Sequence, residues 1–302
     1  MKLKSTVFAL LSMLIVGSML LTACAQAGPE LGTEENPIIW AVVPSGETER
    51  VVSGFDQVAA MIKVETGLVI KSQVATEYAG VIEAMCADPV KAHMGSLATF
   101  AYILASEKGC AEVGLVSSRF GNAFYNGQIY VRADSGINTI ADLKGKTFCR
   151  PDPLSTSGWI IPSITLKAAG VDPETDLAQV VDAGSHDAAV AGVYNGDCDA
   201  GSSYVDARTR IEGDYPDVMD VIKVIELSVN IPNDGVQFVP SFPEEMRAQI
   251  IAALLKIAGT EEGVAALDTA YQWTALEEHD DTFYDPFRQI LDAAGINVEE
   301  LQ

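Results

Sequence analysis

Asp152-Pro153-Leu154-Ser155-Thr156-Ser157-Gly158 is the stretch that decides the fold, because it joins an expected strand to a helix expected over 159–169. The first turn of a helix leaves N–H groups without an intrahelical partner and carries a partial positive charge. One Ser or Thr would suffice as an N-cap. Three consecutive hydroxyl residues followed by Gly therefore predict a cradle for an anion at Ser155, Thr156 and Ser157.

Strands and helices alternate on both sides of this junction, which is typical of an α/β fold. Before the junction we expect strands over 38–43 and 68–74, helices over 51–66 and from Tyr78, and short apolar segments at 92–97 and 114–117. After it we expect strands over 179–182, 200–205 and 221–227 and a helix over 187–196.

Extended stretches at 127–131 and 232–238 mark two places where the chain passes from one group of elements to another. We therefore expect the chain to enter a second lobe at the first stretch and to return from it at the second. Lobe 1 would then comprise residues 37–127 and 235–302, and lobe 2 would comprise residues 128–234. The remainder from Pro243 onward is expected to be helical.

Two further strand ends carry polar side chains. Gly184-Ser185-His186-Asp187 places the single histidine of the expected lobe 2 at a helix start, where a neutral imidazole can donate one hydrogen bond to an oxyanion. Taken alone, this histidine is better explained as a cap or a surface residue than as a ligand contact. Ser202-Ser203-Tyr204-Val205-Asp206 places a phenol and a carboxylate at the end of a strand, and a plain surface position is the alternative for Asp206.

The N-terminus has the pattern of a signal sequence that is removed. Met1-Lys2-Leu3-Lys4 precedes an uncharged apolar run over 7–21. Leu21-Thr22-Ala23-Cys24 follows and resembles a bacterial lipobox, in which the cysteine is lipidated. We therefore expect a signal peptide over 1–23, a lipid on Cys24 and a tether over 24–36. An ordinary secretory signal and an N-terminal membrane anchor are the alternatives.

Acidic residues dominate the composition, with 42 Asp and Glu against 19 Lys and Arg. Loss of Lys2 and Lys4 with the leader leaves 17 basic residues and a formal net charge of −25. Nucleic acid is not an expected partner of so acidic a chain. No other run is long and apolar enough to span a bilayer. We expect an extracytoplasmic protein that its lipid anchor holds at the cell membrane.

Four cysteines remain besides Cys24, and an even number in an exported chain predicts two disulfides. Sequence alone permits three connectivities. Pairing Cys86 with Cys110 and Cys149 with Cys198 keeps each bridge within one expected lobe, and buried free thiols are the alternative. A metal site is not expected, because no pair has CxxC spacing and no His lies near any of the four.

Several segments of the chain occur in the order found in one family of transport proteins. The chain resembles the phosphate-, phosphite- and phosphonate-binding proteins of ABC importers over nearly all of its mature length. The segments that carry the resemblance are residues 76–85, Asp142-Leu143-Lys144-Gly145-Lys146, residues 152–158, His186-Asp187-Ala188-Ala189-Val190, Asn195-Gly196-Asp197 and Asp199-Ala200-Gly201.

The resemblance implies a type II periplasmic-binding-protein fold, in which crossing hinge strands join two lobes and the ligand lies in the cleft between them. It also implies a monomeric receptor that delivers a phosphorus oxyanion to a membrane permease, with no catalytic residue, metal or cofactor. The expected ligand contacts are Tyr78, Ser155, Thr156, Ser157, His186, Tyr204 and Asp206.

Two positions bear on the identity of the anion. Where family members often have a tyrosine, this chain has Phe100, which cannot donate a hydrogen bond and mildly favours a ligand with an apolar face, such as P–H or P–CH3. Asp206 can accept a hydrogen bond from a protonated oxyanion and so discriminate against sulfate. Because the cradle uses dipoles rather than Lys or Arg, we expect affinity to depend weakly on salt.

Two other functions are compatible with the same residues. A sensor that signals to a membrane kinase would use the same closing lobes. A hydrolase would need a nucleophile and a base, which Ser155 and His186 could mimic, but the sequence offers no third orienting group and no oxyanion-hole signature.

Overall fold

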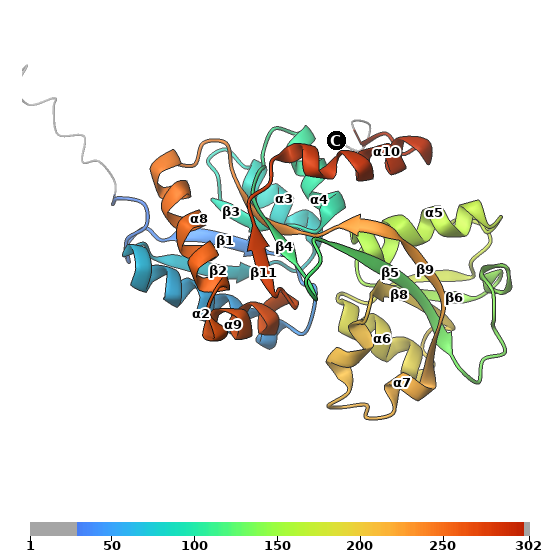
Figure 1. Cartoon of the computed structure of the whole chain (residues 1–302). Helices are drawn as coiled ribbons and strands as arrows, with labels where there is room; N and C mark the ends of the chain where they lie inside the picture. The colour runs from blue at the N-terminus through green and yellow to red at the C-terminus, as the bar shows by residue number, and fades with distance from the viewer. Residues whose placement is uncertain (1–28, 299–302) are drawn as a thin grey trace, which may run out of the picture.

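Two β-sheets, each flanked by helices, divide the chain into two lobes (Figure 1). The computed structural model describes residues 29–298. Lobe 1 contains a six-stranded sheet with the order β11-β4-β10-β3-β1-β2, and lobe 2 contains a five-stranded sheet with the order β7-β6-β8-β5-β9. The α/β class expected from the alternation of strands and helices is confirmed.

Lobe 1 is built from the first and last parts of the chain. Its strands are β1 (Ile38–Val42), β2 (Ile70–Val74), β3 (Met94–Ser96), β4 (Glu112–Ser118), β10 (Gly235–Phe238) and β11 (Ala275–Glu277). Its helices are α2 (Thr48–Thr66), α3 (Tyr78–Cys86), α4 (Thr99–Glu107), α8 (Glu244–Ala258), α9 (Glu261–Tyr271), η4 (Asp281–Tyr284) and α10 (Asp285–Ala293). Strand β1 runs parallel to β2 and β3, whereas β10 runs antiparallel to β3 and β4.

Lobe 2 is built from the middle of the chain. Its strands are β5 (Phe124–Arg132), β6 (Thr147–Arg150), β7 (Gln179–Asp182), β8 (Ala200–Tyr204) and β9 (Ile222–Pro232). Its helical segments are η1 (Ile140–Leu143), η2 (Thr156–Ile160), α5 (Ile161–Ala168), α6 (His186–Asn195), η3 (Ala207–Ile211) and α7 (Val218–Val221). Strand β6 runs parallel to β7 and β8, and β5 runs antiparallel to β8 and β9.

The chain passes between the lobes twice, and the two crossings lie side by side. The first crossing follows β4 and enters β5 at Phe124, and the second leaves β9 at Pro232 and enters β10 at Gly235. Phe124 and Pro232 are partners in the antiparallel register of β5 and β9. The borders expected from the sequence, at 127/128 and 234/235, lie close to these crossings.

Two elements of lobe 1 differ from the expectation. Helix α4 has no predicted counterpart, because residues 99–105 are all buried and so lack the polar face that marks an amphipathic helix. The prediction that the region from Pro243 onward is helical throughout is wrong at β11, which pairs with the end of β4. A strand of 3 residues is too short to show an alternating pattern.

The expected signal peptide and the expected lipid site Cys24 lie outside the described residues. The described part of the expected tether contacts lobe 1, because Leu31 packs against its core and the carbonyl of Gly32 accepts a hydrogen bond from the Val69 N–H at 2.8 Å. Within residues 29–298, no helix is both long enough and apolar enough to cross a membrane.

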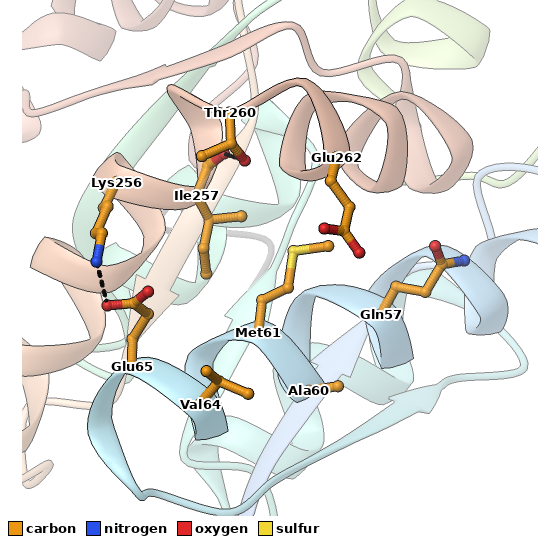
Figure 2. Close-up of a pocket in the computed structure, with 9 residues that line it drawn as sticks. All are labelled: Gln57, Ala60, Met61, Val64, Glu65, Lys256, Ile257, Thr260 and Glu262. Carbon is orange, nitrogen blue, oxygen red and sulfur yellow. Dashed lines mark hydrogen bonds and ion pairs between the residues drawn. The ribbon is translucent and has the colours of Figure 1, made fainter.

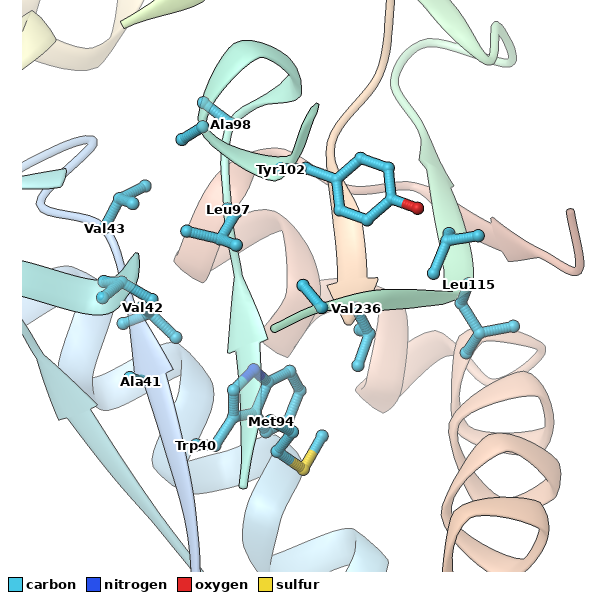
Figure 3. Close-up of a cluster of buried hydrophobic side chains, with 14 of the residues drawn as sticks. Trp40, Ala41, Val42, Val43, Met94, Leu97, Ala98, Tyr102, Leu115 and Val236 are labelled. Atoms are coloured by element: carbon cyan, nitrogen blue, oxygen red, sulfur yellow. The ribbon is translucent and has the colours of Figure 1, made fainter. Parts of the chain in front are cut away.

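The core of lobe 1 forms around its central strands, as Figure 3 shows. Trp40 of β1 is fully buried, and its ring packs edge-on against Phe55 of α2 at a centroid distance of 4.8 Å. The indole Nε1 donates a hydrogen bond to Ser96 Oγ at 3.1 Å, so its polar group is satisfied within the core. This packing fixes α2 and β3 relative to β1, whose carboxyl end leads toward lobe 2.

One disulfide lies in each lobe. Cys86–Cys110 joins the end of α3 to the segment before β4, with a Cα–Cα distance of 4.9 Å. Cys149–Cys198 joins β6 to the segment before β8, with a Cα–Cα distance of 5.8 Å. Both distances are usual for a disulfide. The pairing that keeps each bridge within one lobe is confirmed.

Replacing both Cys149 and Cys198 by Ser should lower the free energy of unfolding by about 2–4 kcal/mol, because the bridge restricts the unfolded chain. Urea unfolding of the oxidised wild type and the double variant measures this loss. The Cys86/Cys110 double variant is the matched comparison and should lose less, since its sequence separation is 24 rather than 49 residues. Equal unfolding midpoints for the wild type and the Cys149/Cys198 variant would contradict the prediction.

Candidate functional site

A small cavity lies between the lobes. The volume in which the centre of a water-sized sphere can be placed is about 10 Å³. The residues that line it are Val43, Ser45, Tyr78, Ala98, Arg119, Tyr125, Ser155, Thr156, Ser157, His186, Tyr204 and Asp234. The structure therefore brings together six of the seven expected ligand contacts, with Asp206 missing. By this measure the cavity has room for about one water-sized group as the lobes lie here.

The hydroxyl cradle over 155–157 is buried at the start of the helical turn that leads into α5. Ser155 is the N-cap, and its Oγ accepts a hydrogen bond from the N–H of Gly158 at 3.2 Å. Thr156 Oγ1 accepts a hydrogen bond from the N–H of Phe100 in lobe 1 at 2.9 Å, so the threonine hydroxyl proton is left to donate elsewhere. A side chain at position 158 would clash, since its Cβ would lie 2.5 Å from Pro151.

Four helical segments begin at this cavity. They are α3 at Tyr78, α4 directly after Ala98, η2 at Thr156 and α6 at His186. Helices α3 and α4 have no side-chain N-cap of their own. Their first N–H groups therefore need partners from outside the helix. The positive ends of several helix dipoles meet here, and this arrangement favours an anion.

His186 is buried in the cavity wall, and its Nε2 lies 3.3 Å from Ser155 Oγ. Its Nδ1 is buried and has no hydrogen-bond partner within the described chain. Burial, together with the positive charge of Arg119, lowers the pKa of His186 to about 3. The imidazole is therefore neutral near pH 7, with one N–H to donate and one nitrogen to accept.

Three tyrosines add neutral donors to the wall. Burial raises the pKa of Tyr125 and of Tyr204 to about 12, with further contributions from Asp234 and Asp187 respectively. Burial, followed by the charge of Asp152, also raises the pKa of Tyr78. All three phenols therefore stay protonated at physiological pH and can donate to an anion.

Arg119 and Asp234 are functional candidates that the sequence reasoning missed. Arg119 Nη2 donates to Asp234 Oδ2 at 2.9 Å, and Nη1 donates to Asn233 Oδ1 at 2.8 Å. Burial disfavours the charge of Arg119, but Asp234 more than compensates, so the pKa of Arg119 is raised. The cavity therefore contains one cationic side chain in addition to the cradle over 155–157. A charged residue directly after β4, next to the Gly121 turn, was the available signal.

Asp206 and Phe100 are placed differently from what the sequence suggested. Both carboxylate oxygens of Asp206 accept hydrogen bonds from Arg208, at 2.9 and 2.7 Å, and Gln128 donates to one of them at 3.3 Å. Burial raises the pKa of Asp206, and Arg208 more than offsets this, so that the pKa is lowered overall. Phe100 is buried within lobe 1 and does not line the cavity, to which Tyr125 supplies a phenol instead.

A larger and more open hollow of about 460 Å³ lies on lobe 1 between α2 and the α8–α9 region (Figure 2). Its walls are mostly apolar, with Met61, Val64 and Ile257 among them. The ammonium group of Lys256 is paired with Glu65 at 2.6 Å, so it is not free for an anion. Converging donors are found at the interlobe cavity, which is the stronger candidate site.

The variant His186→Gln should flatten the pH dependence of stability. The unfolded chain protonates His186 below about pH 6.5, whereas the folded state resists protonation down to about pH 3. Stability from the neutral imidazole is therefore present above pH 6.5 and is lost as pH falls, by up to about 1.4 kcal/mol per pH unit. Urea unfolding at pH values from 4 to 7 measures the slope. Parallel curves for the two proteins would contradict this prediction, because other acidic groups titrate equally in both.

The chain matches the family model described as "ABC transporter, phosphonate, periplasmic substrate-binding protein" over residues 40–284. The phosphate-import protein PhnD of Mycolicibacterium smegmatis is 31% identical over 201 residues, which are 62% of each chain. The phosphonates-binding periplasmic protein of Escherichia coli is 26% identical over 232 residues, which are 74% of this chain and 67% of that protein. The chain thus spans just under two thirds of the length of the first relative.

Solved structures agree on the fold. A binding-protein component of an ABC phosphonate transporter from Pseudomonas aeruginosa has a TM-score of 0.79 at 23% identity, covering 86% of this chain and 87% of that one. PhnD1 of Prochlorococcus marinus, in complex with methylphosphonate, has a TM-score of 0.75 at 14% identity, covering 86% and 98%. The expected type II periplasmic-binding-protein fold is confirmed. The chain belongs to the family of periplasmic substrate-binding proteins of phosphonate ABC transporters.

Proposed function

We propose that this protein is the receptor of an ABC importer and captures a phosphorus oxyanion between its two lobes. The observation that carries the proposal is the interlobe cavity, where four helical segments begin among buried hydroxyl groups. The names of the relatives in M. smegmatis and E. coli, a phosphate importer and a phosphonate-binding protein, support the same ligand class. The anion then completes hydrogen bonds that the protein alone leaves open.

The proposed ligand contacts combine both lobes. Thr156 donates its free hydroxyl proton, Tyr78 and Tyr204 donate phenol protons, and the cradle over 155–157 supplies the positive end of its helix. His186 contributes its Nδ1, the nitrogen without a protein partner. Asp206 is not part of the proposed set, because Arg208 already occupies both of its oxygens.

The salt dependence of binding follows from how the charges are arranged. Arg119 is 6% exposed and is paired with Asp234, so the pair is shielded from dissolved ions. The other donors are neutral. The affinity for the anion should therefore change little with salt concentration, both because the donors are neutral and because the Arg119–Asp234 ion pair is buried. This also explains how a chain with a net charge of −23 can bind an anion.

A hydrolytic role for the Ser155 and His186 pair lacks support. The distance of 3.3 Å allows a hydrogen bond, but no group orients the imidazole through Nδ1. A histidine with a pKa of about 3 is also a poor general base at neutral pH. We therefore propose a binding protein and not an enzyme.

The location and assembly of the protein are part of the same proposal. The mature chain would begin at a lipidated Cys24 and remain on the outer side of the cell membrane. It would act as a monomer, deliver its ligand to a membrane permease, and close lobe 1 (37–127 and 235–302) on lobe 2 (128–234). A sensor, the alternative function, requires the same binding step.

Isothermal titration calorimetry against phosphate, phosphite, methylphosphonate, 2-aminoethylphosphonate and sulfate, at two salt concentrations, tests the proposal. We expect micromolar or tighter binding to at least one phosphorus oxyanion and little change with salt. Absence of binding across the panel would contradict the proposed ligand class.

Thr156→Ala should weaken that binding by about 1.5–3 kcal/mol, the usual value of a hydrogen bond to a charged group. Ser155→Ala should also weaken it, because Ser155 caps the cradle helix and lies 3.3 Å from His186 Nε2. Ser163→Ala is the matched control, because Ser163 lies on α5 and donates to the Ile160 carbonyl, away from the cavity. Unchanged affinity in both cradle variants would show that the cradle does not hold the ligand.

A further inference from the structure

Three helices of lobe 1 have N-terminal N–H groups that donate to side chains of lobe 2. For α2, the N–H of Glu47 donates to Asp187 Oδ2 at 3.0 Å. For α3, the N–H of Tyr78 donates to Asp152 Oδ2 at 3.0 Å. For α4, the N–H of Phe100 donates to Thr156 Oγ1 at 2.9 Å. Side chains that satisfy helix N-termini usually come from the residue just before the helix, whereas these come from the opposite lobe.

The contact at α2 is the one that includes an ion pair. Asp187 Oδ2 also lies 2.5 Å from Arg50 Nη2 in the first turn of α2, and the two side chains are 11% and 23% exposed. Next to it, the N–H of His186 donates to the carbonyl of Ser45 at 3.1 Å. Since Arg50 belongs to lobe 1 and Asp187 to lobe 2, these bonds exist when the lobes are together and are lost when they separate.

Neither Arg50 nor Asp187 lines the ligand cavity. Asp187 is nevertheless the neighbour of His186 in the first turn of α6, and its Oδ1 is buried without a hydrogen-bond partner. A buried carboxylate oxygen without a partner is costly. The other oxygen of this carboxylate contacts Arg50 and the N–H of Glu47 in lobe 1, so Asp187 contributes to holding the lobes together.

We propose that Arg50 and Asp187 form a latch that sets the equilibrium between the open and closed lobes without touching the ligand. The latch rests on the proposed function in one respect, because it assumes that closure of the lobes is the step that retains the ligand. The apparent affinity of a receptor falls in proportion to the population of its binding-competent state. The latch therefore tunes affinity for every ligand by the same factor.

Asp187→Asn and Arg50→Gln test the latch, with Asp134→Asn as the matched control. Asp134 pairs with Arg132 at 3.0 Å, but both residues belong to lobe 2, so the control removes an ion pair that does not join the lobes. Thermal unfolding first establishes that each variant is folded. The readouts are the radius of gyration of the ligand-free protein from X-ray scattering, and association and dissociation rates for each oxyanion that the wild type binds.

We expect Asp187→Asn to raise the dissociation rate by roughly 10- to 100-fold, the equivalent of one hydrogen bond to a charged group. The factor should be the same for each bound oxyanion, and the association rate should be unchanged. Arg50→Gln should also raise the dissociation rate. The increase in the double variant should be smaller than the product of the two single increases, because the two residues act as one unit. The cradle variant Ser155→Ala, whose hydroxyl contacts His186 and Gly158 of the same lobe, should instead show factors that differ between oxyanions.

Dissociation rates in both latch variants equal to those of the wild type and the Asp134→Asn control would overturn the latch. If the wild type binds no oxyanion, the proposed ligand class is wrong. The latch is then tested by the radius of gyration of the ligand-free protein, which does not depend on the ligand. A larger ligand-free radius in both latch variants then supports it, and an unchanged radius overturns it.

Discussion

The buried ion pair between Arg119 and Asp234 is the interaction on which the rest of the structure depends. Arg119 stands at the end of β4 on the first crossing, and Asp234 stands before β10 on the second. Asp234 Oδ1 also accepts hydrogen bonds from Ser117 and from the indole of Trp273, each at 3.0 Å. The pair thus joins both crossings to the core of lobe 1. Loss of one partner would leave a buried charge uncompensated, which typically costs about 3–5 kcal/mol.

The same pair determines the electrostatics of the cavity. Its positive member lies close enough to His186 to add to the effect of burial on the imidazole pKa, which keeps the ring neutral. Its guanidinium lies 5.2 Å from the ring centroid of Tyr125 and 5.8 Å from that of Tyr204, so it also orders two of the phenols. The cavity therefore presents neutral donors around the charge of Arg119, which Asp234 balances. The net negative charge of the chain has little influence there.

Local patterns predicted the parts of this site that lie at single strand-to-helix junctions. The cradle over 155–157 and His186 lie at helix starts that follow strands, and Tyr204 is the last residue of β8, so short segments were sufficient to find them. Arg119 and Asp234 could not be found in this way, because they are 115 residues apart and meet only in the folded chain.

Two errors have equally physical causes. The role expected of Asp206 ignored Arg208, two residues later, which lies within reach of its carboxylate and pairs with it. Helix α4 was missed because a segment buried on all sides gives no periodic signal, and its position depends on packing against α3 and η2. Patterns of polarity report contact with solvent, and they lose information where an element has none.

Contacts between the lobes lie at the same helix starts that line the cavity. The N-termini of α3 and α4 each give one N–H to lobe 2, to Asp152 and Thr156, and Tyr78 and Ala98 at these same helix starts line the cavity. Thr156 has both roles at once, since it accepts from lobe 1 and retains a proton to donate. A ligand that orients this hydroxyl also strengthens the contact between the lobes, because hydrogen bonds in a chain polarise one another. In the proposed function, recognition of the anion and closure of the lobes would therefore use one hydrogen-bond network.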